Sequence, residues 1–412
     1  SQPPLQLPYW VHCITTCFVC QGFPSRPQPQ RVFPFGQKPS EKDLHQAGFH
    51  GTMSVVKKGA DGMEQEHKRR VRYAGTHPRT FQEKYKELNP EKYQQEVEKL
   101  LRKGKTPAGM HIPICVEEIL SFLEIQPGQI GLDATLGYGG HSRRMLEALR
   151  GKGHLYATDV DPIESEKTRQ RLEQAGYGPE ILTIRQMNFS QLDQVAPGVL
   201  FDFVLADLGV SSMQIDNPAR GFTFKQDGPL DLRLNPTEGV TAAQRLRELD
   251  REELAAMLVE NADEPYADAI AGAIWKRRKS GYSIDTTRQL AETVESALAF
   301  LPQKERKDGV RKACQRTFQA LRIDVNSEFE VLYQFLEKLP LVLKPGGKAA
   351  ILTFHSGEDR LVKKSFQAFA REGIYEAVAK EVIRPSPQEC AKNPRARSTK
   401  MRWAIRSHLP FP

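Results

Sequence analysis

Three glycines and two carboxylates follow apolar segments and are the residues of this chain best suited to chemistry. The glycines are Gly137, Gly139 and Gly140, while Asp159 and Asp207 each end a later apolar run. Glycines without a side chain let the backbone approach a ligand closely. A carboxylate about twenty residues beyond such a loop can accept hydrogen bonds from both hydroxyls of a ribose. Together these residues predict a site for a nucleotide-like cofactor.

Short apolar runs separated by helix-compatible stretches must position these residues. The runs predict strands over 130–134, 154–159, 181–185 and 201–207, and a helix over 142–150 follows the glycines. Strands that alternate with helices form a mostly parallel sheet covered on both faces. Ligands bind at the carboxyl ends of the strands in such sheets. We therefore expect an α/β fold with the glycine loop and both aspartates at one edge.

The alternation of strands and helices stops after Gln214 and resumes only much later. Helical patterns fill the interval, at 242–249, 252–259, 267–278 and 287–300, before a strand at 348–354. The interruption predicts an all-helical domain, 216–318, inserted into a sheet domain made of 106–215 and 319–406. Because domain interfaces commonly hold substrate clefts, we expect the insertion to recognise the substrate.

The residues before 106 fall into two parts of different composition. Residues 1–52 are rich in Pro and Gln and lack acidic residues before Glu41, which is typical of an organelle-targeting leader or a disordered tail. Residues 53–105 carry a basic cluster and a charged helical pattern, which predict an RNA-contacting arm or a solvated helix. The leader favours a chloroplast location, with the mitochondrion and the bacterial cytoplasm as alternatives.

The overall composition limits the class of protein. A net charge of +8 favours a polyanionic partner, although a generally basic surface would give the same value. Six unevenly spread cysteines argue against a disulfide framework. Cys13, Cys17 and Cys20 lack a second ligand pair at zinc spacing, so we expect no metal. The apolar run 11–20 is too short to span a bilayer, and we expect no membrane partner.

The residues after the third and fourth predicted strands bear on which cofactor binds. The glycine loop lacks the G-x-G-x-x-G spacing that presents a helix N-terminus to a pyrophosphate. Asn188 and Phe189 follow the third strand and, with Asp207, offer edges for an adenine and an amino-acid moiety. These features favour S-adenosylmethionine, which has no phosphate. A dinucleotide remains the alternative on these residues alone.

Several longer motifs occur in one order between residues 111 and 406. They are ADLGVSSMQID at 206–216, RGFTF at 220–224, GPLDLR at 228–233, RTFQALRI at 316–323, FHSGEDR at 354–360 and NPRARS at 393–398. Together they closely resemble the RsmH (MraW) family of small-subunit ribosomal RNA cytidine N4-methyltransferases. The resemblance implies a Rossmann-like class I methyltransferase fold with an inserted helical domain.

The resemblance also implies an activity and a cofactor site. The activity would be transfer of a methyl group from S-adenosylmethionine to the N4 amine of a cytidine in the decoding region of small-subunit ribosomal RNA. The implied cofactor contacts are Gly139, Gly140, His141, Asp159, Phe189, Asp207 and Gln214. The alternatives are a ribosomal-RNA-binding assembly factor without turnover and a methyltransferase for another amine. A homodimer is compatible with the sequence, which does not determine the oligomeric state.

Three residues are candidates for catalysis. Methylation of a weakly nucleophilic amine requires in-line placement, which can lower the barrier by about 7–11 kcal/mol, and an acceptor for the N–H. Asp207 is the first candidate to contact the amine, although a role in cofactor binding alone is the alternative. Asp231 and His355 are further candidates. Asp231 could instead form a structural ion pair with Arg233, and His355 could cap a strand–helix junction.

Two motifs depart from the resembled family, and both lie on the expected substrate side. The chain has KACQR at 312–316 where the family usually has His-Pro-Ala-Thr-Arg, and Gly357 where the family has Leu. The expected RNA contacts comprise aromatic residues that stack on bases or lie in the core, Phe222, Phe224 and Phe318, and basic residues for phosphates, Arg395, Arg397, Lys400, Arg402 and Arg406.

Overall fold

The computed structural model describes residues 113–409. The predicted leader, 1–52, and the predicted arm, 53–105, lie outside the described residues. Within 113–409, no helix is long and apolar enough to cross a membrane.

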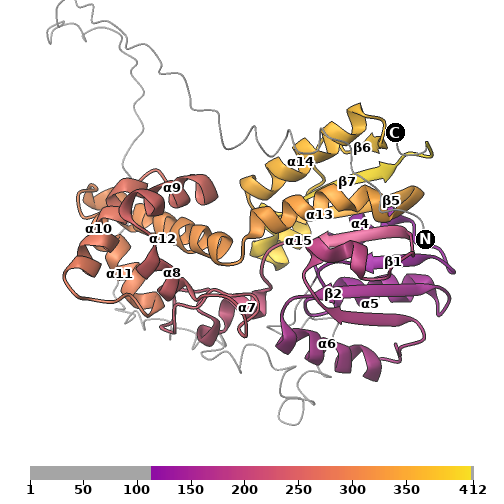
Figure 1. The fold of residues 1–412 in the computed structure, drawn as a ribbon, viewed down its shortest axis with the longest axis horizontal. Coiled ribbons are helices and arrows are strands. Elements are labelled where there is room, and N and C mark those ends of the chain that lie inside the picture. The colour runs from indigo at the N-terminus through magenta and orange to yellow at the C-terminus, as the bar shows by residue number, and fades with distance from the viewer. Residues whose placement is uncertain (1–112, 410–412) are drawn as a thin grey trace, which may run out of the picture. The chain divides into compact units, whose positions relative to one another are not determined.

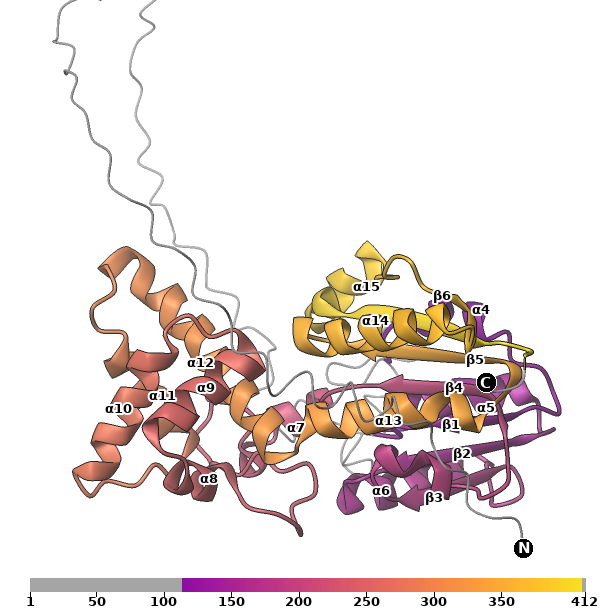
Figure 2. The same cartoon turned by 45° about the horizontal axis from the view of Figure 1, so that its top comes forward.

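A seven-stranded sheet forms the centre of the described chain. Its strands are β1 Ile130–Asp133, β2 His154–Asp159, β3 Leu182–Gln186, β4 Phe201–Asp207, β5 Leu343–Thr353, β6 Tyr375–Val378 and β7 Lys400–Arg406. They lie in the order β3-β2-β1-β4-β5-β7-β6. β1 to β5 pair in parallel, and only β7 runs antiparallel to its neighbours β5 and β6. The expectation of a mostly parallel α/β sheet is confirmed (Figure 2).

Helices cover both faces of this sheet, as its apolar strands require. The helices are α4 Val116–Leu123, α5 Gly140–Leu149, α6 Pro162–Gln174, α13 Glu328–Val342 and α14 Ser356–Arg371, with the short α15 Pro387–Lys392 (Figure 1). The short α7 Ser212–Asp216 follows β4 beyond the end of the sheet. One core joins α13 and α14 to the sheet through Phe335 and Phe366. The other joins α4 and α5 to it through Ile119 and Met145. The two cores give the sheet the doubly wound arrangement of a Rossmann-like fold.

Five further helices share a third core. They are α8 Ala242–Glu248, α9 Arg251–Ala262, α10 Ala267–Lys279, α11 Thr287–Ala297 and α12 Gln303–Val325. Thr241, Asp250 and Thr286 each cap a helix in a reciprocal capping box, which fixes where α8, α9 and α11 begin. The helical core extends as far as Leu321, and α12 runs across position 318. A separate inserted domain at 216–318 therefore remains our proposal, with its second boundary inside a continuous helix.

Parallel pairing brings the ends of separate strands to one edge. Asp133 of β1 pairs with Ala157 of β2 and with Leu205 of β4, each two residues before its own strand ends. β2 and β4 end at Asp159 and Asp207. Three carboxylates that are distant in sequence therefore lie along the same edge of the sheet.

Candidate active site

A cavity of about 1270 Å³ opens at the carboxyl ends of the parallel strands. Its walls come from the glycine loop, the ends of β2 and β4, the turn after β5, and residues around 233–235 and 319–328. The predicted site residues that line it are Gly140, His141, Asp159, Phe189, Asp207, Gln214 and His355. Gly139 and Asp231 are not among the lining residues. The structure thus brings most of the predicted residues to one cavity, although their roles remain predictions.

Gly139 acts within the glycine loop, on the side that packs against α6. It precedes α5 with a φ of 80°, in the left-handed region that favours glycine. A Cβ there would lie 2.6 Å from Cγ2 of Thr168. The hydroxyl of Thr168 in turn donates to the carbonyl of Gly137 at 2.6 Å. Gly139 therefore allows α6 to pack closely on the loop that borders the cavity.

Asp159 holds the other side of the glycine loop. Its Oδ2 accepts from the backbone N–H of Gly137 at 2.7 Å, and its Oδ1 accepts from that of Asp161 at 2.9 Å. Burial raises the pKa of this carboxyl to about 6, against the effect of these two hydrogen bonds. Each carboxylate oxygen has a further lone pair that can accept from a ribose hydroxyl.

Gln214 connects two of the loops that form the cavity wall. Its Oε1 accepts from the N–H of Ser211 at 2.9 Å, while its Nε2 donates to Asp161 at 3.0 Å. The same oxygen of Asp161 accepts from Arg220 at 2.7 Å. The side chain of Asp161 is fully buried. Gln214 therefore positions the loop after β4 against the loop after β2, besides lining the cavity.

Phe189 provides an apolar part of the wall. The half-buried ring packs edge-to-face on Phe335, with ring centroids 5.2 Å apart and an interplanar angle of 87°. This contact fixes the ring orientation. A fixed aromatic ring at the end of β3 suits a flat group such as an adenine.

Asp207 and His141 face one another in the cavity. The N–H of Asp207 donates to the hydroxyl of Thr135 at 2.6 Å, which fixes the end of β4 to β1. Nδ1 of His141 lies 3.5 Å from Oδ2 of Asp207, and its Nε2 contacts the carbonyl of Ile114 at 2.9 Å. Oδ1 of Asp207 is buried without a hydrogen-bond partner among the described residues. Burial raises the pKa of Asp207 to about 6, although His141 opposes the shift.

His355 lies at the junction between β5 and α14. Its Nδ1 accepts from the N–H of Glu358 at 3.5 Å, so the side chain caps the helix. Its Nε2 lies 3.2 Å from Oε1 of Glu358, within ion-pair distance but without hydrogen-bond alignment. Burial raises the pKa of Glu358, yet His355 and Arg322 outweigh it and lower the pKa overall. His355 thus combines a capping contact with a position on the cavity wall.

Asp231 lies beside the cavity and holds a residue that lines it. Its two oxygens accept from Nε and Nη2 of Arg233 at 2.7 and 2.9 Å. Arg233 lines the cavity. This bidentate pair shows that Asp231 orients the guanidinium of Arg233, whichever further role it has.

Four further residues, which were not among the predicted site residues, also shape the cavity wall. Arg322 makes a bidentate pair with Glu328 at 2.7 and 2.8 Å. Asn326 donates to the carbonyl of Leu232 at 2.8 Å and accepts from the N–H of Leu234 at 2.7 Å. Arg220 donates to the carbonyl of Leu234 at 2.8 Å. Arg220 and Arg322 lie inside the quoted motifs, whereas no sequence signal marked Asn326 or Glu328.

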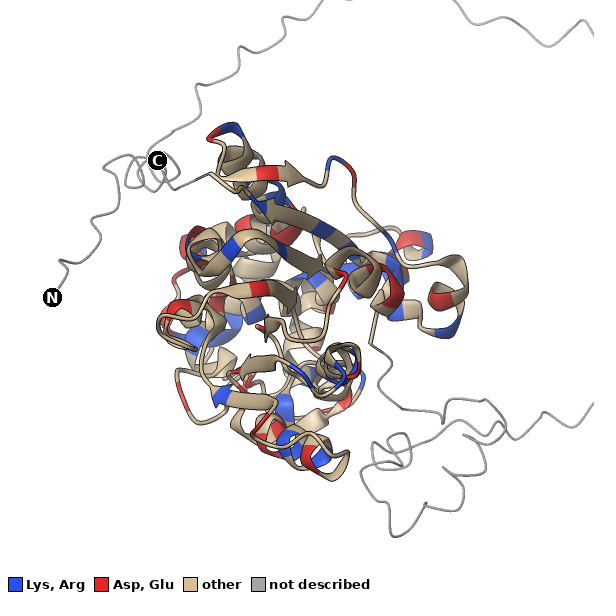
Figure 3. Cartoon of the chain, turned by 90° about the vertical axis from the view of Figure 1, so that its right-hand side faces the viewer, with Lys and Arg blue, Asp and Glu red and all other residues tan. Residues whose placement is uncertain are grey.

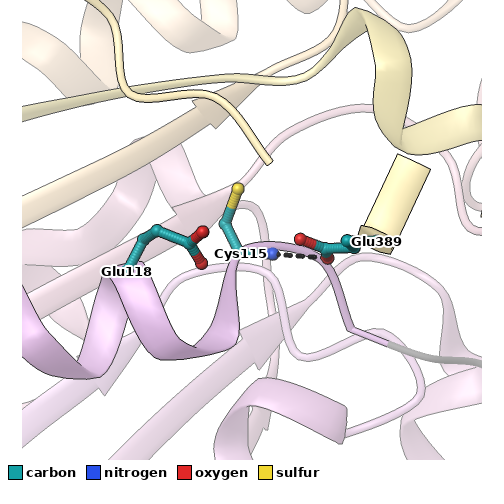
Figure 4. A group of neighbouring side chains, drawn as sticks. All are labelled: Cys115, Glu118 and Glu389. Carbon is teal, nitrogen blue, oxygen red and sulfur yellow. Dashed lines mark hydrogen bonds between the residues drawn. The ribbon is translucent and has the colours of Figure 1, made fainter. Parts of the chain in front are cut away.

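Among residues 113–409, two groups of side chains have donor atoms close enough to hold a metal ion. The first is Glu328, His355 and Glu358. In this group the carboxylate of Glu328 already accepts hydrogen bonds from Arg322. The second is Cys115, Glu118 and Glu389 (Figure 4). The N–H of Cys115 donates to Glu389 at 2.9 Å and so attaches α4 to α15. Burial, reinforced by the neighbouring carboxylates, raises the pKa of the Cys115 thiol. This thiol is therefore protonated at neutral pH.

Some of the expected RNA contacts are wrong. Arg402 is buried and its Nε donates to Asp359 at 2.6 Å, and Arg406 is buried against backbone carbonyls. Neither side chain is available to a phosphate. Phe318 and Phe224 pack on one another in the helical core, with centroids 5.4 Å apart, so the alternative that they are core residues holds. Arg395 does line the cavity, where it pairs with Asp216 at 2.8 Å.

Comparison with known proteins places most of the chain in one group. Residues 108–407 match the MraW methylase family. Ribosomal RNA small subunit methyltransferase H 1 of Lachnoclostridium phytofermentans is 64% identical over 348 residues, covering 84% of this chain and 95% of the relative. The protein of the same name from Agathobacter rectalis is 64% identical over 345 residues, covering 84% and 99%.

Solved structures are more distant. An rRNA methylase from Streptococcus thermophilus is 13% identical, with a TM-score of 0.33, covering 72% of this chain and 99% of that one. A putative methyltransferase from Streptococcus mutans, solved in complex with SAH, is also 13% identical, with a TM-score of 0.35 and the same coverage.

Proposed function

Because the chain belongs to the MraW methylase family, we propose that it transfers a methyl group from S-adenosylmethionine to the N4 amine of a cytidine in the decoding region of small-subunit ribosomal RNA. Over 345–348 aligned residues the chain is 64% identical to relatives named as ribosomal RNA small subunit methyltransferases, which supports methyl transfer to that RNA. The base and the atom that receive the methyl group are the finer part of the proposal.

The residues of the cavity fit S-adenosylmethionine. The glycine loop offers bare backbone, Asp159 has free lone pairs for ribose hydroxyls, and Phe189 offers a fixed ring for the adenine. The bound cofactor would supply an electrophilic methyl group on a sulfonium. Binding the positively charged end of the cofactor is the alternative role for Asp207, in place of a contact with the substrate amine.

One observation carries the proposal: Asp207 lines the cavity, and its carboxylate accepts no hydrogen bond within residues 113–409. An amine that accepts a methyl group develops positive charge on nitrogen and needs an acceptor for its N–H. Oδ1 of Asp207 is buried without a partner in the described part of the chain and Oδ2 lies 3.5 Å from His141, so the carboxylate can accept from that amine without breaking an existing hydrogen bond. The proton then leaves to this carboxylate or to water.

The proposal is tested by methylating purified small ribosomal subunits with labelled cofactor and analysing the nucleosides by mass spectrometry. We expect label on the N4 of a cytidine, and little label with Asp207→Asn. A complex with RNA but without turnover would instead favour a non-catalytic assembly factor. Label on another base or atom would favour a methyltransferase for another amine.

The compartment and the oligomeric state of the protein are also predictions from the sequence. The relatives reported above are bacterial, which supports the bacterial cytoplasm among the compartments considered. A chloroplast location rests on the composition of residues 1–52 alone. A homodimer also remains a prediction, which sedimentation of the purified protein would test.

A further inference from the structure

Helix α12 carries a stripe of polar side chains that leads into the cavity. Apart from the adjacent Arg311 and Lys312, successive members are three, four or seven residues apart, and at about 100° per residue all six lie on one side of the helix. We call this set the α12 stripe: Lys304, Arg311, Lys312, Gln315, Gln319 and Arg322. The first four are exposed, while Gln319 and Arg322 line the cavity.

The charge of the stripe is mostly uncompensated. α12 holds seven Lys or Arg and three Asp or Glu, so it contributes much of the net charge of +8. Within the described part of the chain, Lys304 and Lys312 have no recorded ion-pair partner. Arg311 has only an exposed pair with Asp308 at 3.3 Å, which is weak in water. Asp308 lies on the same face, four residues from Lys304 and from Lys312, so the three cations leave a net charge of +2 for an anionic ligand.

The other side of α12 holds the stripe in place. Ala313, Phe318 and Leu321 are buried in the helical core, so the helix cannot rotate to hide its basic face. At the cavity end, Arg322 is fixed by its bidentate pair with Glu328. The stripe therefore presents its charges at fixed positions. By contrast, Figure 3 shows basic and acidic residues interspersed along the helices on the side of the sheet.

We propose that the α12 stripe binds the RNA strand that flanks the target nucleotide and leads it into the cavity. This inference rests on the proposed function. Lys304, Arg311 and Lys312 would contact phosphates, and the amides of Gln315 and Gln319 would contact sugar or base edges near the cavity. From Lys304 to Arg322 the stripe extends about 27 Å, long enough for several nucleotides.

The position of the stripe also accounts for a departure from the resembled family. Lys312 and Gln315 are two of the residues at which 312–316 differs from the usual family motif. Both are exposed and belong to the stripe. The departure therefore changes an RNA-facing surface and leaves the buried face of α12 apolar.

The test is a variant that removes the three charges, Lys304→Ala with Arg311→Ala and Lys312→Ala. Its matched control is Lys363→Ala with Arg371→Ala and Lys380→Ala, three exposed charges away from the cavity. We expect the stripe variant to bind a single-stranded RNA carrying the target about tenfold more weakly at 0.15 M salt. The slope of log K against log salt should fall by about 2, at about 0.7 per phosphate contact. Affinity for S-adenosylmethionine should not change.

The outcomes separate this inference from the proposed function. If the wild-type protein methylates the RNA and the stripe variant binds that RNA with the same affinity as the control variant, the α12 stripe does not bind RNA. If the stripe variant binds naked RNA normally but binds whole subunits more weakly, the stripe contacts a ribosomal protein. This result would also contradict the inference. If the wild type binds RNA through the stripe but never methylates it, only the proposed function fails. A variant with Lys304→Arg and Lys312→Arg, which keeps both charges, should bind the RNA about as tightly as wild type. This result would show that the alanine variant loses binding because it loses charge.

Discussion

His141 faces Asp207 in the cavity, with its Nδ1 3.5 Å from Oδ2 of the carboxylate. Nε2 of His141 lies 2.9 Å from the carbonyl of Ile114, which can only accept, so Nε2 carries a hydrogen. In a neutral ring Nδ1 then has a lone pair, which would face Oδ2 of Asp207 and repel it. The contact is favourable when either Nδ1 or the carboxyl also holds a proton. The accepting capacity of Asp207 is therefore tied to His141.

Replacing the carboxylate tests its role in methyl transfer. Asp207→Asn keeps the size of the side chain and removes its charge. We expect kcat to fall by about 100-fold or more, because the developing positive charge on the amine loses its acceptor. Affinity for S-adenosylmethionine, measured by calorimetry, should stay within a few-fold of wild type. A large loss of cofactor affinity with an unchanged kcat would show that Asp207 acts only in cofactor binding.

The rate should depend on pH through the same carboxyl. Burial raises the pKa of Asp207 to about 6, and the ionised form is the one that accepts a hydrogen bond from the amine. Below pH 6 kcat/KM, which reports groups of the free enzyme, should therefore fall about tenfold per pH unit, and above about pH 7 it should be constant. His141→Asn should shift this midpoint upward because His141 lowers the pKa of Asp207. A flat profile between pH 5 and 8 would contradict the assignment.

The stability of the fold should change with pH in the opposite sense. A carboxyl whose pKa is higher in the folded state than in the unfolded state stabilises the fold at low pH, and this contribution is lost as the pH rises through about 6. Asp207→Asn should therefore gain up to about 3 kcal/mol in free energy of unfolding between pH 4 and pH 8, relative to wild type. Urea unfolding at the two pH values measures the difference. If Asp207→Asn changes the free energy of unfolding equally at pH 4 and pH 8, the pKa of Asp207 is not raised in the folded protein.

The strands that end in these carboxylates were predictable from the sequence, because a buried parallel strand is a continuous apolar run. The predicted bounds of β2 and β4 agree with the structure, those of β1 differ by one residue at one end, and those of β3 differ by one residue at both ends. β7 was missed: its alternating basic residues suggested a phosphate-binding tail. Only the distant partner Asp359, which lies in α14, explains why Arg402 is buried there.

The contacts that shape the cavity could not be predicted from local pattern. Asp161 meets Gln214 and Arg220 across 53 and 59 residues of sequence, and Asn326 meets Leu234 across 92. The spacing of apolar residues along a helix or strand does not predict contacts between residues so far apart in sequence. The motifs marked which segments contribute, and only the fold shows which atoms pair.

The buried pair of Arg220 and Asp161 should be one of the more sensitive ion pairs in the protein. Nη1 of Arg220 donates to a fully buried carboxylate at 2.7 Å. Arg220→Ala should cost about 3–5 kcal/mol in free energy of unfolding, because Asp161 loses its charged partner in the interior. Arg143→Ala removes the exposed pair with Glu147 and should cost less than about 1 kcal/mol. Similar costs for both variants, measured by urea unfolding, would mean that Asp161 is not held by this contact.

Gly139 offers a way to separate backbone strain from steric contact in the glycine loop. Gly139→Ala places a Cβ at a φ of 80° and 2.6 Å from Cγ2 of Thr168. Gly151→Ala has a similar φ of 71° with no atom within 4 Å, so it carries the strain alone. We expect Gly151→Ala to cost about 1–2 kcal/mol, and Gly139→Ala to cost about 1–3 kcal/mol more and to weaken cofactor binding.

A second substitution checks which contact causes that extra cost. Thr168→Ser removes Cγ2 and keeps the hydroxyl that donates to Gly137. In the Gly139→Ala background it should therefore recover the extra cost and part of the cofactor affinity, while the cost of positive φ remains. In the Gly151→Ala background the same change should recover nothing, since Gly151 has no neighbour there. Equal recovery in both backgrounds would show that α6 and the glycine loop are not packed through Gly139.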